Sequence, residues 1–139
     1  KDTPIISYRT HVQDIGWQNY VNDNGIAGTM GQNKRLEAIV INSTNLPEGA
    51  SIKYRTHIQD IGWETAWRTT GELSGTVEKA KRLEAIQIEL VGVPGYHIEY
   101  RTHIQDNGWE TNWRRDGQIS GTVGQSKRLE AIQIRIVKD

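Results

Sequence analysis

Polar side chains that could do chemistry recur three times along this chain at nearly fixed intervals. Each set holds one histidine, one aspartate, one arginine and one glutamate. The sets are His11, Asp14, Arg35 and Glu37; His57, Asp60, Arg82 and Glu84; and His103, Asp106, Arg128 and Glu130. A catalytic site usually needs groups in unequal environments, so that one acts as an acid and another as a base. Three near-identical sets are typical of three equivalent contact points, so the sequence favours a ligand-binding protein over an enzyme.

Two other uses of these residues stay open. The Asp and Glu residues would suit a glycosidase, but the sequence does not fix the separation of their carboxyl groups. No G-x-S-x-G, H-E-x-x-H or phosphate-binding glycine loop occurs. With no cysteine and four isolated histidines, a metal site would require the repeats to converge on one axis. We expect no metal and no cofactor, and we interpret the histidines first as half-exposed strand residues bonded to neighbours.

The aromatic residues point to a ligand class, because the chain has five tryptophans and no phenylalanine. Indole faces stack on sugar rings and the indole N–H bonds hydroxyls, which favours a saccharide site. The first aromatic of each repeat could equally fill the core, whereas the second precedes a polar turn and is expected to be exposed. The candidate ligand-binding set joins the aromatics to the histidines and aspartates: Trp17, Tyr20, Trp63, Trp67, Trp109, Trp113, His11, His57, His103, Asp14, Asp60 and Asp106.

The charges in the R-L-E-A-I segment need an explanation, since strict alternation would point Arg128 and Glu130 to the same side as Ile132. One hypothesis is a structural ion pair at the rim, bonded to the aspartate of the same repeat. The other is a polar pocket in which a bidentate arginine grips a ligand. We favour the structural hypothesis.

These residues belong to three tandem copies of one unit. YRTHVQDIGW at 8–17 returns at 54–63 and 100–109 with small changes, and KRLEAI begins at 34, 81 and 127. Residues 52–91 and 98–137 share 28 identities in 40 positions without gaps, which indicates duplication. We place the repeats at 5–46, 50–92 and 96–138 of a single domain spanning 1–139, with the turn-rich segments 45–49 and 92–95 as joints.

The first repeat lacks one residue after its first tryptophan, so Tyr20 aligns with Trp67 and Trp113. Asn24 then takes the place of a turn glycine, as the residue that best tolerates positive φ after glycine. The extra Thr65 and Thr111 are predicted to lie in a bulge or a turn.

Side-chain periodicity within a repeat is two, which predicts strands. Ile98, Tyr100, Thr102 and Ile104 alternate with polar residues, and Ile132, Ile134 and Ile136 repeat the pattern near the end. The segment between them, WETNWRRDGQISG, predicts one more strand or a short hairpin, giving three or four antiparallel strands per repeat. A helix over SKRLEAI is the weaker alternative, because IQIRIV follows at once.

We therefore expect an all-β fold with pseudo-threefold symmetry, because one repeat cannot bury its apolar face alone. A β-prism is favoured by the long alternating strands, and a β-trefoil is the alternative. Seventeen basic residues balance seventeen acidic ones, which argues against nucleic acid as a partner. No apolar run approaches the length that crosses a bilayer and no signal peptide opens the chain, so we expect a mature protein or a fragment without membrane insertion.

The shared pattern resembles a known family, the clostridial hydrophobic repeats with a recurring tryptophan, called ChW repeats. Y-R-T-H-x-Q-D-x-G-W, a second aromatic, a D/N-G turn, S-G-T and R-L-E-A-I-x-I cover nearly the whole chain. The resemblance implies a secreted or cell-surface protein of a Gram-positive anaerobe, in which such repeats accompany hydrolases, adhesins and lysins as cell-wall or polysaccharide-binding modules. Tyr20 and Asn107 depart from the pattern, so one site is expected to be weaker than the others.

Two functions are consistent with these observations. The first is a multivalent module that binds cell-wall polysaccharide or peptidoglycan and is attached to a catalytic or surface domain absent from this chain. The second is a protein-interaction or adhesion module of a surface protein. Repetition gives avidity in both cases, so it does not separate them.

Overall fold

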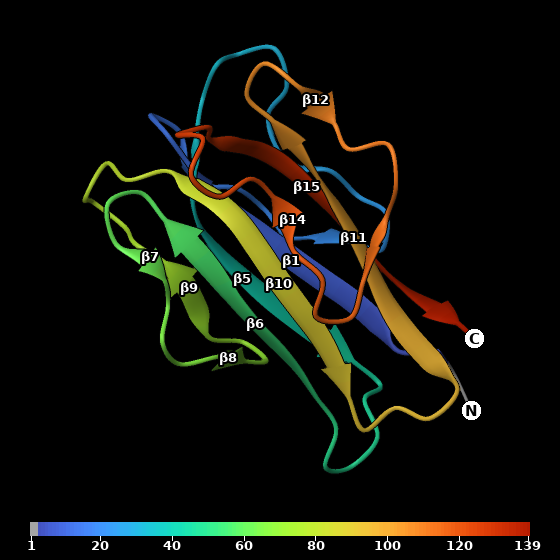
Figure 1. The fold of residues 1–139 in the computed structure, drawn as a ribbon. Coiled ribbons are helices and arrows are strands. Elements are labelled where there is room, and N and C mark those ends of the chain that lie inside the picture. Colours follow the sequence, from blue (N-terminus) through green and yellow to red (C-terminus); the bar gives the residue numbers. More distant parts are fainter. Residues whose placement is uncertain (1–2) are drawn as a thin grey trace.

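A computed structural model describes residues 3–139, and each repeat in it forms five strands (Figure 1). The first repeat holds β1 (Ile5–Val12), β2 (Gly16–Trp17), β3 (Val21–Asn22), β4 (Ala27–Gly28) and β5 (Leu36–Thr44). The second holds β6 (Ser51–Ile58), β7 (Gly62–Trp63), β8 (Arg68–Thr69), β9 (Leu73–Gly75) and β10 (Leu83–Val91). The third holds β11 (Tyr96–Ile104), β12 (Gly108–Trp109), β13 (Arg114–Arg115), β14 (Ser120–Gly121) and β15 (Leu129–Lys138).

The all-β prediction is confirmed, and RLEAI enters strand β15 rather than a helix. Each repeat has five strands, more than the expected three or four, because the middle segment makes three strands of two or three residues. Such short strands leave no periodic pattern in the sequence. Thr65 and Thr111 lie in bends between these short strands, as their extra position predicted.

The two long strands of each repeat pair along their whole length, and burial alternates along the first one. In β11 the side chains of Ile98, Tyr100 and Thr102 are buried, while Arg101 and His103 are half-buried on the outer face. The partner β15 breaks the alternation at a β-bulge, because His103 pairs with Ala131 and Ile104 with Leu129. Glu130 is the extra residue at this bulge, and Glu37 and Glu84 occupy the same position in β5 and β10. The bulge explains why a glutamate is buried next to leucine and alanine.

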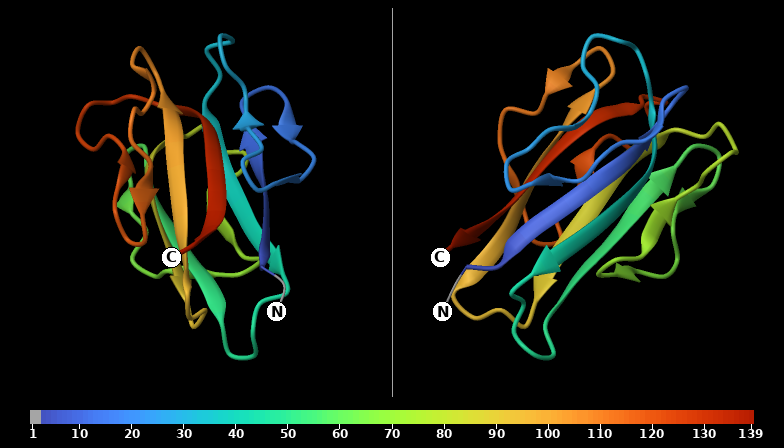
Figure 2. Two further views of the ribbon diagram at one scale, coloured as in Figure 1. Left: turned by 90° about the vertical axis from the view of Figure 1, so that its right-hand side faces the viewer. Right: turned by 180° about the vertical axis from the view of Figure 1, so that it is seen from behind.

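Each of the three sheets takes four strands from one repeat and one from another. Strand β9 of the second repeat pairs with β5, β14 of the third pairs with β10, and β4 of the first pairs with β15. The last of these pairings joins the first and third repeats, so the exchange closes around the molecule (Figures 1 and 2). Three similar antiparallel sheets thus correspond to the three repeats, while the choice between prism and trefoil stays a prediction.

Three buried tyrosines tie the sheets together inside the common core. The Tyr8 hydroxyl accepts from the backbone N–H of Ile134 at 3.0 Å and donates to Gly25. Tyr54 and Tyr100 accept from the preceding repeat in the same way, at 3.2 Å in both cases, from Ile41 and Ile88 respectively. Burial raises the pKa of Tyr54 to about 12, which favours the neutral hydroxyl that makes these bonds.

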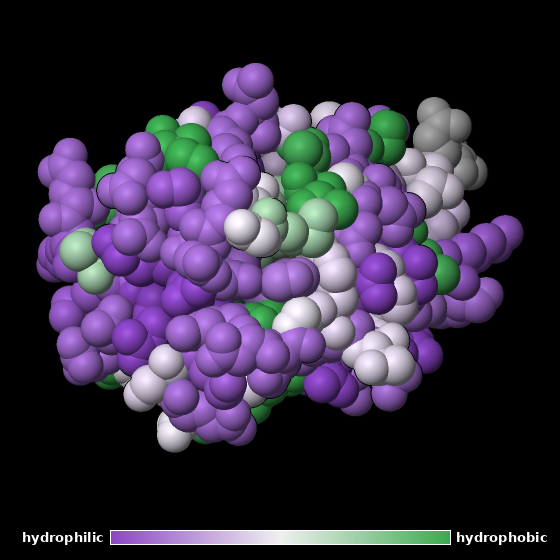
Figure 3. All heavy atoms as spheres, turned by 90° about the horizontal axis from the view of Figure 1, so that it is seen from above, coloured by the Kyte–Doolittle hydropathy of each residue, from purple (hydrophilic) through white to green (hydrophobic). Residues whose placement is uncertain are grey.

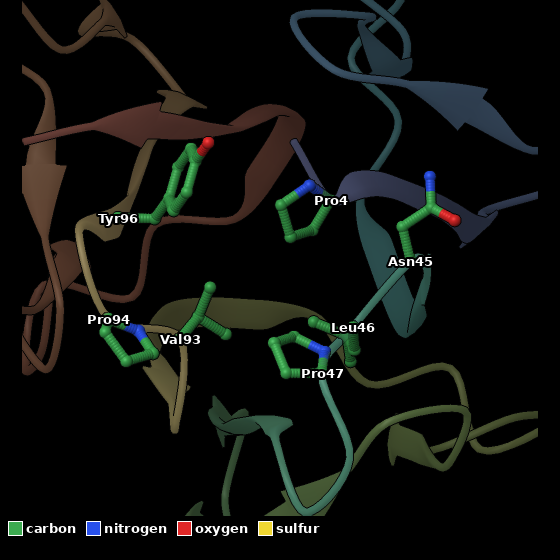
Figure 4. Close-up of a pocket in the computed structure, with 7 residues that line it drawn as sticks. All are labelled: Pro4, Asn45, Leu46, Pro47, Val93, Pro94 and Tyr96. Atoms are coloured by element: carbon green, nitrogen blue, oxygen red, sulfur yellow. The ribbon is translucent and has the colours of Figure 1, made fainter. Parts of the chain in front are cut away.

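The joints between repeats gather at one end of the molecule. Leu46, Pro47, Val93 and Pro94 surround a hollow there together with Tyr96 (Figure 4). Thr3 lies 3.3 Å from the Tyr96 hydroxyl, and the Asp139 N–H donates to Gly95 at 2.8 Å. Both ends of the described chain therefore lie beside the joint that links the second and third repeats. Within residues 3–139 no helix is long and apolar enough to cross a membrane.

Candidate functional site

The outer faces of strands β1, β6 and β11 carry the candidate polar residues of each repeat. Because side chains alternate along a strand, the arginine and the histidine of Y-R-T-H both point away from the core. The following hairpin pairs that histidine with the first tryptophan, as His11 with Trp17, His57 with Trp63 and His103 with Trp109. Local strand pairing thus brings the predicted histidine and tryptophan together.

An arginine lies between the two aromatic rings of every repeat. The Arg55 guanidinium carbon is 5.2 Å from the Trp63 ring centre and 4.9 Å from that of Trp67. The other two clusters have nearly the same geometry, and we call these three groups the aromatic clusters: Arg9 with Trp17 and Tyr20, Arg55 with Trp63 and Trp67, Arg101 with Trp109 and Trp113. The rings do not form an open slot, since the cation occupies the space between them. A ligand can stack only on ring faces that the cation leaves free, and Trp113 also has the Arg135 guanidinium carbon 3.8 Å from its ring centre.

The exposure of the aromatic rings agrees with a surface role. Trp17, Trp63 and Trp109 are half-buried and lie outside the core, and Tyr20 is 44% exposed. Trp67 and Trp113, which we expected to be exposed, are instead half-buried in contact with arginine. The alternative that the first tryptophan of each repeat fills the core does not hold, since Trp17, Trp63 and Trp109 are absent from it.

The histidines belong to a network with the bulge glutamate and its arginine. His57 Nδ1 lies 2.8 Å from Glu84 Oε1, and Arg82 Nε donates to Glu84 Oε2 at 2.8 Å. The indole of Trp63 meets the imidazole edge-on, with ring centres 5.3 Å apart. The first and third repeats repeat this network with His11, Glu37 and Arg35 and with His103, Glu130 and Arg128. The predicted ion pair is present, but its partner is histidine and not the aspartate that we expected.

The aspartates of Q-D-x-G lie apart from the aromatic clusters. Asp14, Asp60 and Asp106 sit in the hairpin turns with φ between 65° and 69°, a conformation that aspartate tolerates well. Their carboxylates are 70–71% exposed and lie 3.4–3.5 Å from a lysine amino group, that of Lys34, Lys81 or Lys127. The structure therefore places these predicted ligand contacts in turns, where they shape the hairpin.

A small polar hollow of about 320 Å³ lies beside Trp109 in the third repeat. Trp109, Glu110, Arg114 and Thr122 are among its lining residues. The Trp109 indole N–H donates to Met30 Sδ at 3.1 Å, whereas the equivalent positions Val77 and Val123 offer no acceptor. No acceptor for the indole N–H of Trp17 or Trp63 is found among residues 3–139, so both can meet a ligand hydroxyl.

The first repeat differs from the others across its outer face. Arg55 and Arg101 donate to Gln87 and Gln133, both at 2.9 Å. Val40 occupies that position in the first repeat, and Arg9 Nε is buried without a hydrogen-bond partner within the described chain. The first aromatic cluster is therefore less firmly held than its two counterparts.

Sequence reasoning missed Arg9, Arg55 and Arg101, although each lies between two aromatic residues that it did single out. The pattern alone gave no reason to separate these arginines from ordinary solvated strand residues. Their one sequence signal was position, directly after the buried tyrosine in all three repeats. Within residues 3–139, no group of three or more His, Cys, Asp or Glu side chains could hold a metal ion.

Comparison with known proteins gives a family match in each repeat. A family model described as clostridial hydrophobic W, ChW, matches residues 11–45, 57–92 and 103–138, which together make up most of the chain. No catalytic domain is identified alongside these repeats. Neither the curated proteins nor the solved structures contain a significant match.

Proposed function

Because the chain belongs to the clostridial hydrophobic W (ChW) repeat family, we propose that it is a non-catalytic, multivalent module that binds bacterial cell-wall polysaccharide. The observation that carries the proposal is the aromatic cluster, which recurs on three outer faces with partly exposed rings. Flat aromatic faces beside an arginine donor suit a hydroxylated ring. In this proposal the module is secreted or cell-surface and serves a catalytic or surface domain elsewhere in its protein.

Three similar clusters on one rigid body support binding to a polymer rather than to a single sugar. Each cluster alone would bind weakly, because its rings lie at the surface and not in a deep pocket. A repetitive polymer can engage a second cluster at a high effective concentration, so the total affinity exceeds that of one cluster. Peptidoglycan and the polysaccharide attached to it both supply such repeated epitopes.

A recurring set of exposed apolar residues favours a second candidate, a protein-interaction or adhesion module. Ile26, Leu73 and Ile119 occupy equivalent positions and are 42%, 40% and 44% exposed. Seen from above, apolar side chains appear as separate groups on a mostly hydrophilic face (Figure 3). Repeated exposed apolar residues can mark a protein contact, although single ones are common on any surface.

Co-sedimentation with purified Gram-positive cell walls tests the proposal. The triple variant Tyr20→Ala, Trp67→Ala and Trp113→Ala is expected to lose retention on protein-free walls while unfolding as cooperatively as the parent chain. The matched control is the triple variant Ile26→Ala, Leu73→Ala and Ile119→Ala, which should be retained.

The two triple variants separate the candidates. Retention of the parent chain only on walls that keep their proteins, with loss of the apolar variant but not of the aromatic variant there, would favour a protein contact and overturn the saccharide proposal. Walls stripped of secondary polymers then distinguish peptidoglycan from the attached polysaccharide, and soluble saccharide should quench or shift tryptophan emission if the rings stack on sugar.

A further inference from the structure

A polar pocket of about 400 Å³ lies where the three repeats meet, at the end of the molecule opposite the joints. Every repeat contributes the residue that follows its first long strand and the arginine of R-L-E-A-I. These six side chains are Gln13, Gln59, Gln105, Arg35, Arg82 and Arg128. No aspartate or glutamate lines the pocket.

The three arginines are held in place by contacts behind the pocket. Each donates from Nε to the bulge glutamate of its own repeat, at 2.8 Å in all three cases. The glutamate in turn contacts histidine, so its oxygens are already engaged. The ends of the guanidinium groups remain available: Arg128 donates to Asn33 at 3.2 Å, and no acceptor is found among residues 3–139 for the terminal nitrogens of Arg35 and Arg82.

The three glutamines are oriented in a way that also leaves donors free. The side-chain oxygen Oε1 of Gln59 accepts from the Arg82 backbone N–H at 3.1 Å, and the backbone N–H of Gln59 donates to the Arg82 carbonyl at 2.9 Å. Gln13 and Gln105 make the same contacts with Arg35 and Arg128. With each side-chain oxygen engaged, the amide NH₂ groups have no acceptor within the described chain.

We propose that this axial pocket binds a tetrahedral oxyanion, a phosphate or sulfate group, on the pseudo-threefold axis. Such an anion has a threefold axis of its own and can present one oxygen to each repeat, which a planar carboxylate cannot do. Guanidinium groups match these oxygens with paired N–H donors. The pocket is separate from the aromatic clusters, so the inference does not depend on the saccharide proposal.

The three remaining lining positions offer a variant that leaves the arginines and glutamines intact. Asn33, Ala80 and Ser126 occupy equivalent places, each with φ of 55–56°. Ala80→Asp brings one negative charge into the pocket, and Ala80→Asn copies the residue of the first repeat without that charge. Both replacements tolerate the backbone conformation better than alanine does, so both variants are expected to fold.

Isothermal titration of the full chain with inorganic phosphate, at constant ionic strength in chloride, tests the site. We expect saturable binding, weakened at least about tenfold by Ala80→Asp and changed less than about threefold by Ala80→Asn, since a like charge within a few ångström opposes the anion. Side-chain Arg Nε and Gln amide NMR signals should shift on the same titration curve.

Controls fix the ligand chemistry and its source. Citrate should bind more weakly than phosphate, since its carboxylates are planar. Binding of methyl phosphate as tight as that of phosphate would assign the site to phosphoryl groups on a larger molecule, and selective binding of inorganic phosphate would assign it to the free ion. Absence of saturable binding, or equal affinity in the Ala80→Asp variant, would overturn the proposal.

Discussion

A buried carboxylate that follows the first tryptophan shows how the repeats diverged residue by residue. Glu64 accepts from the backbone N–H of Thr56 and of Gly75, both at 3.1 Å, from Ser74 and from Arg68. The first repeat has Gln18, Val21 and Ala27 in place of Glu64, Arg68 and Ser74. An uncharged amide needs no cation beside it, and the Gln18 side chain is satisfied by Gly28, whose backbone N–H donates to Gln18 Oε1 at 2.8 Å.

Exchange of this one residue should therefore be costly unless its neighbours change with it. Glu64→Gln alone turns one acceptor into a donor that faces Gly75 and Arg68, and we expect it to lower the free energy of unfolding by about 1–3 kcal/mol. The triple variant Glu64→Gln, Arg68→Val and Ser74→Ala, which copies the first repeat, should recover most of that loss. Urea denaturation of the three proteins measures both steps, and a triple variant no more stable than the single one would contradict this account.

A histidine found only in the third repeat gives the molecule a pH dependence. His97 contacts Glu99 at 2.9 Å and Asp139 at 2.7 Å, and these hydrogen bonds, led by that of Glu99, raise the pKa of His97 against the effect of burial. Burial would raise the pKa of Glu99, but hydrogen bonds from His97 and Arg135 lower it overall. The pair is thus stabilised in its charged form.

The sign of the effect follows from these two shifts. The contribution of His97 to the free energy of unfolding is complete below its unfolded pKa of 6.5. It is lost as pH rises through the higher pKa of the folded state. The contribution of Glu99 to the free energy of unfolding is complete above its unfolded pKa of 4.5. It is lost as pH falls through the lower pKa of the folded state. His97→Ser, which copies Ser51 of the second repeat, should cost about 1 kcal/mol between pH 4.5 and 6.5 and progressively less at higher pH. Denaturation midpoints across pH measure this, and a constant cost would refute it.

At the scale of single residues, the sequence indicated which residues lie together better than it indicated their hydrogen-bond partners. It singled out the histidines and the aromatic residues, which strand pairing does bring together. It also assigned the aspartates to the site, and the structure places them in turns with positive φ, so their role as ligand contacts stays a prediction. The sequence could not predict that His57 is the partner of Glu84, since the β-bulge that orients the Glu84 side chain leaves no periodic pattern.

Among the elements, the short exchanged strands depend on glycine. Gly75 in β9 has φ of +105°, and a Cβ there would lie 2.5 Å from the Glu37 carbonyl oxygen and 2.8 Å from the Ala38 Cα. Backbone atoms cannot yield as a side chain can, so the pairing of β9 with β5 requires glycine. Gly28 and Gly121 are in the same position in β4 and β14.

Gly75→Ala is accordingly expected to destabilise the protein by about 3 kcal/mol or more, through steric conflict added to backbone strain. Gly62→Ala is the matched control, because φ there is +91° but no atom lies within 4 Å of the added Cβ. It should cost about 1 kcal/mol, the strain alone. Thermal unfolding of the two variants compares them, and equal shifts would show that contact with the neighbouring strand is unimportant.

The long strands could be predicted from the sequence, whereas the exchange between repeats could not. Alternating burial over eight or nine residues carries a clear period of two, as in β6 and β11. Strands of two residues have no period, and nothing in the order of residues states that Gly75 pairs with the preceding repeat. The S-G-T part of the repeated pattern was visible in the sequence, and only the Cβ conflict reveals the role of its glycine.

For the whole molecule, the exchange of strands means that a stable fold requires the first repeat to pair with the third. The Tyr8 hydroxyl accepts from the Ile134 backbone N–H, and β4 pairs with β15, so the sheet of the third repeat is completed by a strand of the first. Each repeat has the same relation to its neighbour, and in this chain the cycle is covalently interrupted between the third repeat and the first. Symmetry of this kind predicts that the stability of the fold depends little on which of the three joints is left open.

A circular permutant tests this directly. Joining residue 139 to residue 1 through a short Gly-Ser linker and opening the chain between Gly49 and Ala50 moves the break from one joint to another, since Gly49 is exposed and lies in a turn. We expect this permutant to unfold cooperatively within about 1–2 kcal/mol of the parent, the scale of a change in loop closure. A second permutant opened between Ile39 and Val40, both buried in β5, should fail to fold. If the first permutant also failed, the covalent order of the repeats would matter as much as their pairing, and closure by strand exchange would not suffice to define the fold.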